Sequence, residues 1–481
     1  MTMGGRSVLA TASRLTQLAI CLSAAFALDR DALAGTVTAC NDSGGAGTLR
    51  SVVAAAASDE NIDVTNCSSI TLTSGQITSS LTKLRIVGSV TAPTTIFGNN
   101  ASRVITHTGT GGSLLLRGLT ITNGYVTGTT ALGGCVYSAA NVVSLDSVRV
   151  ENCTAKETSA SGVARGGGVY AAHLIDLRNS VITGNTARQQ SASYFKARGG
   201  GIYAESLSAF NSSIRENQAE SVGGGITSQY TEGGGIVTTG GARLYNTTVN
   251  GNQAGKYAGM KLDKDGVNSV VIANSTITGN LAMHSHGAFG VGGAPFVLAN
   301  STVVFNQSYF ANGTAGIVAR GSVKLLSSIV ARNTFSNGTG SDLVLEGMGA
   351  SIDPASANNL IMVSAAVLPA DTIRADPRLE ALEDNGGRTR THALKHDSPA
   401  LDRGNALFEY GNFTPLTCDQ RGHPGVAQSN PPNTDNCNDM TFGYLRVDSD
   451  PLHMHPDIGA YEEQLPNPDW IFYDGHEGDY L

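Results

Sequence analysis

Short runs of alternating apolar and polar residues recur along this chain at intervals of 26 to 35 residues. Such alternation predicts β-strands with one buried face, because successive side chains of a strand point to opposite sides. We therefore expect two inward columns, each taking one apolar residue from every repeat. The first column is Leu177, Leu244, Ile272, Leu298 and Leu325, and the second is Ile182, Ile214, Val249, Ile277, Val303 and Val330.

A seven-residue unit, Asn-Ser/Thr-x-Val/Ile-x-x-Asn, keeps the same rhythm. Full copies begin at Asn179, Asn211, Asn246, Asn274 and Asn300, and degenerate copies span 146–152 and 327–333. The closing asparagines are Asn152, Asn185, Asn217, Asn252, Asn280, Asn306 and Asn333. Glycine-rich turns that enter a strand stay in phase with them, at 133–137, 166–170, 199–203 and 233–237. A fixed repeat of this length is typical of a solenoid or a propeller.

Three short strands per repeat make one coil of a parallel β-helix, and coils stack at the ~4.8 Å spacing of paired strands. A lone coil buries too little to fold, so stacking provides the stability. Asparagine tolerates the left-handed backbone of turns, and stacked amides can hydrogen-bond along the axis. The competing hypothesis treats Asn-x-Ser/Thr as glycosylation sites. The predicted fold is all-β, a single-stranded parallel β-helix of about ten coils.

The N-terminus has the pattern of a secretory signal peptide. Arg6 and Arg14 precede the apolar stretch Leu15–Leu28, and a small-x-small segment ends at Ala34, where we expect cleavage. The apolar stretch is too short to span a bilayer. A lipoprotein site at Cys21 is disfavoured, because apolar sequence continues beyond it. The predicted segments are 1–34 (signal peptide), 35–70 (N-terminal cap with a short helix), 71–361 (β-helix repeats), 362–464 (closing module) and 465–481 (tail).

Six cysteines remain after the signal, an even number that suits disulfides in an oxidising compartment. Fifteen pairings are possible, and we favour the three that are local in sequence. A metal site is disfavoured, because no Cys-x-x-Cys occurs. The predicted pairs are Cys40 with Cys67, Cys135 with Cys153 and Cys418 with Cys437.

Composition supports many short strands and excludes one class of partner. The chain has 59 glycines, 6% aromatic residues and 15% charged residues, which suits frequent turns rather than long helices. The net charge of −8 and the absence of Lys/Arg runs disfavour nucleic acid, and we expect no transmembrane span in the mature chain.

Blocks at both ends of the chain resemble a known family. The segment Cys40–Arg50 is similar to the start of bacterial secreted β-helix proteins with a choice-of-anchor Q domain, and five ordered blocks of the closing module resemble that domain itself. Those blocks are 376–379, 384–394, 398–402, 419–422 and 457–462. The resemblance implies a right-handed, pectate-lyase-like β-helix displayed outside the cell, in a family without established catalysis. The Gly-Gly-x-Ile/Val repeats are also similar to those of outer-membrane adhesins. The segment 471–477 resembles a C-terminal sorting motif, and the alternative interpretation of this segment is a frayed tail.

Candidate chemistry is sparse. A row of carboxylates on neighbouring coils would suit calcium or acid–base catalysis, but the positions expected beside Asp176 are Val143, Ser208, Arg243, Val271 and Val297. Asp263 and Asp265 in Lys261–Gly266 are weak metal candidates, and a solvated turn is the preferred interpretation.

Two histidine pairs, His284 with His286 and His453 with His455, would each present both rings on one face if extended, but neither has an evident third metal ligand. In the closing module, an ion-pair and turn network is expected to hold the structure rather than to catalyse. Its members are Asp402, Arg421, Asp457 and Glu462.

The sequence therefore predicts a secreted or cell-surface protein that acts in binding or adhesion, with glycans or a neighbouring cell surface as partner. No catalytic residue and no cofactor are expected. The alternatives are a polysaccharide lyase or glycoside hydrolase, and a purely structural matrix protein, because one scaffold can serve all three. The oligomeric state stays open.

Overall fold

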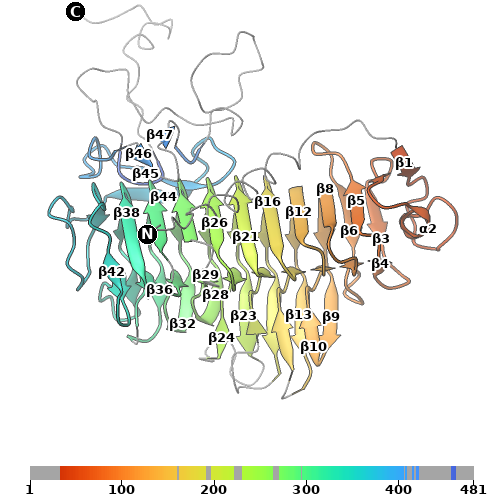
Figure 1. Ribbon diagram of the computed structural model, residues 1–481, viewed down its shortest axis with the longest axis horizontal. Coiled ribbons are helices and arrows are strands. Elements are labelled where there is room, and N and C mark those ends of the chain that lie inside the picture. The colour runs from red at the N-terminus through yellow and green to blue at the C-terminus, as the bar shows by residue number, and fades with distance from the viewer. Residues whose placement is uncertain are drawn as a thin grey trace, which may run out of the picture.

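The protein is a long tube of stacked β-coils with a smaller module along one side (Figure 1). The computed structural model describes residues 33–159, 162–190, 197–221, 230–263, 270–293, 295–311, 313–405, 407–408, 414–415, 419–421 and 457–461. Most of the predicted signal peptide and the whole C-terminal tail lie outside these residues, as do the predicted pair Cys418–Cys437, His453, His455 and Glu462.

Three parallel sheets form the walls of the tube, and ten strands of the third sheet mark about ten coils, as predicted. Sheet 1 contains β1 (Leu33–Thr36), β2 (Asn61–Asp63), β3 (Ser69–Thr71), β5 (Lys83–Val87), β6 (Thr94–Phe97), β8 (Ser113–Thr122), β12 (Val142–Glu151), β16 (Leu174–Arg178), β17 (Val181–Thr183), β21 (Ser206–Phe210), β22 (Ser213–Arg215), β26 (Ala242–Tyr245), β27 (Thr248–Asn250), β30 (Val270–Ala273), β31 (Thr276–Thr278), β34 (Phe296–Ala299), β35 (Thr302–Val304), β38 (Ser322–Leu326), β39 (Ile329–Ala331), β42 (Ser351–Ile352) and β43 (Leu360–Ile361). Sheet 2 contains β9 (Tyr125–Gly128), β10 (Thr130–Leu132), β13 (Thr154–Glu157), β14 (Val163–Arg165), β18 (Thr186–Gln189), β19 (Ala197–Arg198), β23 (Gln218–Ser221), β24 (Thr231–Glu232), β28 (Gln253–Lys256), β32 (Leu281–Ser285), β36 (Gln307–Ser308) and β40 (Thr334–Phe335). Sheet 3 contains β4 (Ile77–Ser79), β7 (Ile105–His107), β11 (Val136–Ser138), β15 (Val169–Ala171), β20 (Ile202–Ala204), β25 (Ile236–Thr238), β29 (Met260–Leu262), β33 (Phe289–Val291), β37 (Ile317–Ala319) and β41 (Leu343–Leu345).

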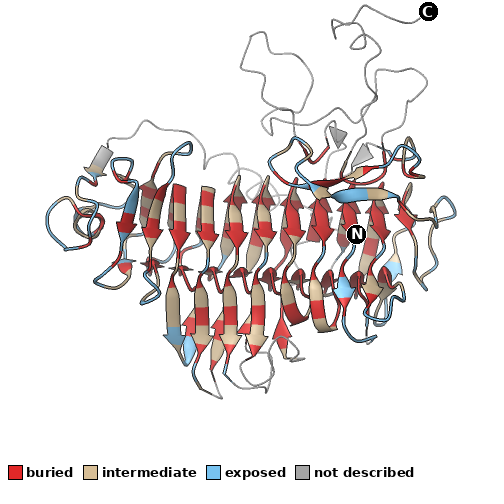
Figure 2. Ribbon diagram, turned by 180° about the vertical axis from the view of Figure 1, so that it is seen from behind, coloured by how far each residue is buried: buried red, intermediate tan, exposed pale blue. Residues whose placement is uncertain are grey.

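The apolar columns predicted from the alternation run through the core. Leu244 of β26 pairs in parallel register with Ile272 of β30, and both side chains are fully buried. Val249 and Ile277 pair in the same way in the second column. All members of both predicted columns are buried, and Figure 2 shows buried and partly exposed positions alternating along the strands.

The two asparagines of each repeat have different structural roles. The leading asparagines, such as Asn179 and Asn211, adopt positive φ angles of 50° and 48° and turn the chain between two strands of sheet 1. The closing asparagines form a buried ladder along the axis: each side-chain amide donates to the Oδ1 atom of the next, over 2.8–3.0 Å. The ladder runs through Asn185, Asn217, Asn252, Asn280, Asn306 and Asn333.

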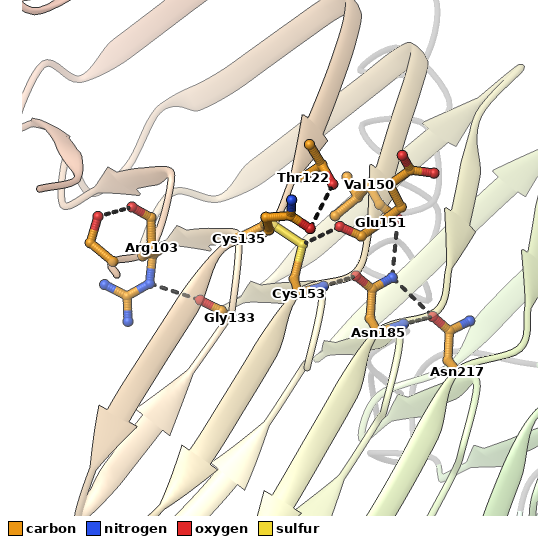
Figure 3. The surroundings of a disulfide bond; sticks show 11 residues. Arg103, Thr122, Gly133, Cys135, Val150, Glu151, Cys153, Asn185 and Asn217 are labelled. Carbon is orange, nitrogen blue, oxygen red and sulfur yellow. Dashed lines mark hydrogen bonds between the residues drawn. A yellow bond between two sulfur atoms is a disulfide. The ribbon is translucent and has the colours of Figure 1, made fainter. Parts of the chain in front are cut away.

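The prediction that Asn152 belongs to this ladder is wrong. Glu151 pairs with Thr183, so Cys153 rather than Asn152 stands opposite Asn185, and the Cys153 N–H donates to the Asn185 Oδ1 atom (Figure 3). In this coil Ser147, with φ 56°, makes the turn, so the degenerate repeat is shifted by one residue. The Cys135–Cys153 disulfide occupies the ladder position where an amide is missing.

The competing glycosylation hypothesis fails at two repeats. Asn274 and Asn300 are leading asparagines of Asn-Ser-Thr triplets, yet they are only 4% and 0% exposed. A glycan needs a surface side chain, so the folded chain cannot carry one at either position.

The N-terminal cap contains the predicted helix, α2 (Leu49–Ala55), which begins after Thr48 and buries Leu49 and Val53 against the first coils. Arg50 forms a two-pronged ion pair with the buried carboxylate of Asp42, with N···O distances of 2.9 Å. The second predicted disulfide, Cys40–Cys67, closes a loop within the cap. The cap therefore covers the apolar end of the stack.

From residue 379 onward, the described parts of the closing module lie along the side of the last coils (Figure 1). Its hairpins are β44 (Leu379–Glu383) with β45 (Thr391–Leu394) and β46 (Leu407–Phe408) with β47 (Thr414–Pro415). Gln420, 2% exposed, bonds to the outward hydroxyls of Thr248 and Thr276, and Ala460 N–H donates to Thr302 Oγ1. These threonines form one row on β27, β31 and β35, so the module docks on a continuous strip of sheet 1.

A flat projection extends from the tube over four coils. Strands β9, β13, β18 and β23 run outward and β10, β14, β19 and β24 return, and both rows of parallel strands meet at β28. Ala164, Ala187 and Ala197 pack between the two rows. We call this projection the fin; it hangs below the tube in Figure 1.

Candidate functional site

A row of tyrosines stands on the outer face of sheet 3, next to the fin. Tyr137, Tyr170 and Tyr203 occupy the same position in β11, β15 and β20 and pair in register. Their rings stack with centroids 5.5 and 5.6 Å apart and interplanar angles of 5° and 6°. The three rings thus repeat once per coil along the tube axis.

Glycine turns place these rings. Gly133, Gly166 and Gly199 have φ angles of 61–64°, and a Cβ atom at each would come within 2.0–2.1 Å of a backbone carbonyl oxygen. Only glycine permits so close a reversal from the fin into sheet 3. The tyrosine always follows four residues later, so the sequence Gly-Gly-x-Val/Ile-Tyr fixes its place.

The phenol hydroxyls face solvent with unused bonding capacity. No hydrogen-bond partner for the hydroxyl of Tyr137, Tyr170 or Tyr203 is found among the described residues, and none of the three oxygens is buried. Burial of its ring raises the pKa of Tyr170, against the opposing effect of Arg165. A phenol hydroxyl can both donate and accept a hydrogen bond, so each of the three offers both functions to a ligand.

Arginines from the turns and the fin accompany the rings. The Arg103 guanidinium lies 5.4 Å from the Tyr137 ring centroid and donates to the carbonyl oxygens of Leu132 and Gly133, each over 2.8 Å. The Arg165 guanidinium lies 4.9 Å from the Tyr203 centroid. Arg165 has no carboxylate partner in the described part of the chain, and its Nε atom is buried without a hydrogen bond. Its positive charge is thus available to a ligand.

A chain of ion pairs continues the row over the next coils. Arg198 pairs with Glu232 at 2.9 Å, and Lys261 bridges Glu232 and Asp263 at 3.1 and 3.2 Å. Counting Arg103 and Arg165, four cations face two carboxylates here, on a chain whose formal net charge is −8. We call the face made by Arg103, Tyr137, Arg165, Tyr170, Arg198 and Tyr203 the tyrosine–arginine strip.

Only one of the two weak metal candidates, Asp263, lies in the described part of the chain. Asp263 forms an ion pair with Lys261, and Asp265 lies outside the described residues. Within the described ranges, no group of three His, Cys, Asp or Glu side chains is placed to hold a metal ion.

His284 and His286 do not extend along one face, because His286 has a φ angle of 64°. Its ring stacks on Tyr257 with centroids 4.7 Å apart, and burial lowers the pKa of His286 to about 4. The Tyr257 hydroxyl accepts from Arg320, which also pairs with Glu346 at 2.8 Å. A neutral imidazole and an ion pair therefore lie together at the far end of sheet 3.

Asp176 has no carboxylate beside it in its row. Its register neighbours are Ser144 and Ser208, so the expectation of Val143 at this position is wrong by the same one-residue shift that displaced Asn152. Burial raises the pKa of Asp176, and Arg178 binds it at 3.1 Å. The side chain is an internal ion-pair partner.

The expected network of the closing module is present in part. Asp457 accepts from the backbone N–H of Asp402 at 2.8 Å, and Arg421 pairs with Asp419 at 2.7 Å and lies over the Tyr461 ring. Asp419 was not among the predicted members, although it directly precedes Gln420 and Arg421. These groups hold turns together.

Sequence reasoning missed the tyrosine–arginine strip. The three tyrosines end the glycine-rich turns that mark the repeat in the sequence. The informative signal was the same aromatic residue at the same place in three consecutive turns, which predicts a stacked row once the fold is known.

No family model and no curated protein matches the chain. Among solved structures the chain is similar to "Crystal structure of pectate lyase Pel9A", with 12% identity, a TM-score of 0.42, and coverage of 89% of this chain and 96% of that chain. The parallel β-helix follows from the strand pairing itself. Among the described residues no helix is long and apolar enough to cross a membrane.

Proposed function

We propose that this protein is exported and binds an extended acidic glycan along the tyrosine–arginine strip, as a surface-binding or adhesion protein. The observation that carries the proposal is the register of Tyr137, Tyr170 and Tyr203, whose free hydroxyls repeat once per coil. A periodic row of donors and acceptors suits a periodic polymer.

Charge favours an acidic ligand. The strip has an excess of cations on an acidic chain, and Arg165 has no carboxylate partner in the part of the chain described. A carboxylate or sulfate of a glycan would supply the anionic partner of Arg165. The affinity should then fall as the salt concentration rises.

Two features of the chain support the proposal of export. The two disulfides fit an oxidising compartment, and the N-terminal sequence has the signal-peptide pattern. The resemblance of the closing module to a choice-of-anchor Q domain suggests that the module attaches the tube to the cell surface.

The direct test is binding of the purified mature protein to an array of acidic and neutral glycans. The double variant Tyr137→Phe/Tyr170→Phe keeps the rings and removes two hydroxyls, so we expect affinity to fall roughly 3- to 30-fold. Arg165→Gln should cost a further factor of about ten. Tyr309→Phe, directly after β36 of sheet 2, and Arg149→Gln, in β12 of sheet 1, are the matched controls. Equal loss in the controls, or no glycan bound, would refute the proposal and favour a structural role.

Polysaccharide cleavage is a second candidate, supported by the neutral His286 beside Tyr257 and the Arg320–Glu346 pair. A neutral imidazole can accept a proton in an elimination or hydrolysis. Turnover of acidic polysaccharides that is abolished in His286→Ala would establish it. Calcium-dependent turnover lost in Asp263→Ala or Asp265→Ala would locate the chemistry elsewhere.

A further inference from the structure

The edge of the closing module forms a small polar pocket against the side of the tube. It has a volume of about 240 Å³ and is lined by Asn179, Ser180, Val181, Asn211, Ser213 and Arg388. Five of these residues come from two adjacent coils of sheet 1, and Arg388 comes from the loop between β44 and β45. The pocket therefore exists only because the module docks on the tube.

The pocket marks the point where the row of leading asparagines emerges from under the module. Asn179 and Asn211 are half-buried, whereas their equivalents Asn246, Asn274 and Asn300 are 9%, 4% and 0% exposed. The module contacts this row directly, since the Thr389 hydroxyl donates to the Asn246 carbonyl oxygen at 3.2 Å. The first two asparagines are thus left open to a ligand.

Three side chains in the pocket have unused hydrogen-bonding capacity. The amides of Asn179 and Asn211 and the hydroxyl of Ser213 have no partner among the described residues. Ser180 differs, because its hydroxyl already donates to the Arg178 carbonyl oxygen at 2.6 Å and accepts from the Val148 N–H at 3.0 Å. Two amides, one hydroxyl and one guanidinium thus converge beside the apolar Val181 side chain.

We infer that this pocket binds a single carboxylate-bearing sugar. Its volume is below the ~300–1,000 Å³ of sites for drug-sized ligands, so one ring fits. The Asn179 and Asn211 amides pair with ring hydroxyls, Val181 contacts the apolar face of the ring, and Arg388 receives the carboxylate. The site is separate from the tyrosine–arginine strip, which lies on sheet 3.

Isothermal titration of the mature protein with D-glucuronate, and with D-glucose as the neutral arm, tests the inference. We expect saturable glucuronate binding that is at least tenfold tighter than glucose binding. Arg388→Gln should remove that preference, and Asn211→Asp should abolish glucuronate binding through like-charge repulsion. Arg390→Gln, an exposed arginine two residues away and outside the pocket lining, is the matched control and should bind normally.

The outcomes are distinct from those of the proposed function. Tyr137→Phe/Tyr170→Phe should leave glucuronate binding unchanged, and Arg388→Gln should leave binding of long glycans to the strip intact. Absence of saturable glucuronate binding, or binding that is equal in Arg388→Gln and in wild type, would overturn the pocket assignment whatever the fate of the strip.

Discussion

Asn333 donates both its backbone N–H and its side-chain amide to one carboxylate oxygen of Asp342, over 2.9 and 2.8 Å. The asparagine ladder thus ends on a buried acid whose other oxygen accepts from the Val363 N–H at 2.8 Å. At the opposite end, the ladder begins at Cys153, beside the disulfide to Cys135 (Figure 3). Both ends of the row of amides are therefore closed by groups other than asparagine.

Asp342 should make stability depend on pH. Burial raises its pKa from 3.8 to about 6, despite the three N–H donors that oppose the shift. The folded state therefore favours the protonated acid, and its stabilising effect is present below pH 3.8 and lost as pH rises through about 6. The two values correspond to a loss of roughly 3 kcal/mol.

The variant Asp342→Asn cannot ionise. Its stability relative to wild type should therefore improve by roughly 2 kcal/mol between pH 4 and pH 7. A cost that does not vary with pH is added, because the variant can turn an amide toward the Val363 N–H. Denaturant unfolding at several pH values measures this difference. A difference that does not vary with pH would contradict the assignment of the shift to Asp342.

Removal of one ladder amide should be costly in the middle of the row. Asn252 accepts from the backbone and side chain of Asn217 and donates to the Ile214 carbonyl oxygen and to Asn280. Asn252→Ala leaves these groups buried without partners, so we expect a loss of roughly 3 to 5 kcal/mol in unfolding free energy.

Asn152 provides the control for that loss, because it stands outside the ladder and has a φ angle of 55°. Asn152→Gly suits this backbone and should change stability by less than about 1 kcal/mol. If both variants lost equal stability, the one-residue shift of this coil would be in doubt.

The two described disulfides should protect different regions. Cys40–Cys67 closes 27 residues of the N-terminal cap, and Cys135–Cys153 closes 18 residues at the start of the ladder. Each is expected to contribute about 3 kcal/mol. Hydrogen exchange of Cys40→Ala/Cys67→Ala should show lost protection in α2 and the first coils, and that of Cys135→Ala/Cys153→Ala around β11 and β13. Loss spread evenly along the tube in both variants would argue against separate roles.

The repeat pattern predicted the fold because every coil uses the same physical devices. Leu244 and Ile272 lie over one another because strand alternation and a constant repeat leave one register that buries both. The glycine turns could be located for a similar reason, since the backbone at Gly166 admits no side chain.

The remaining features depend on contacts that a repeat does not encode. The prediction for the first ladder coil was wrong because Asn152 lies one residue out of phase with the ladder. Cys153, the next residue, takes the ladder position. The hydrogen bond between Gln420 and Thr248 joins residues 172 apart in sequence, and neither local sequence predicts this contact. The tyrosine–arginine strip could not be predicted from the repeat, because Arg165 of the fin contacts the ring of Tyr203 in the next coil.

One extended acidic glycan should lie along several coils of the strip. The most direct test of this arrangement is the affinity of the mature protein for oligogalacturonates of increasing length. Affinity should rise with each added residue until the ligand spans Tyr137 to Tyr203, and then level off. If a dimer bound as tightly as an octamer, or if no length bound, the claim would be contradicted.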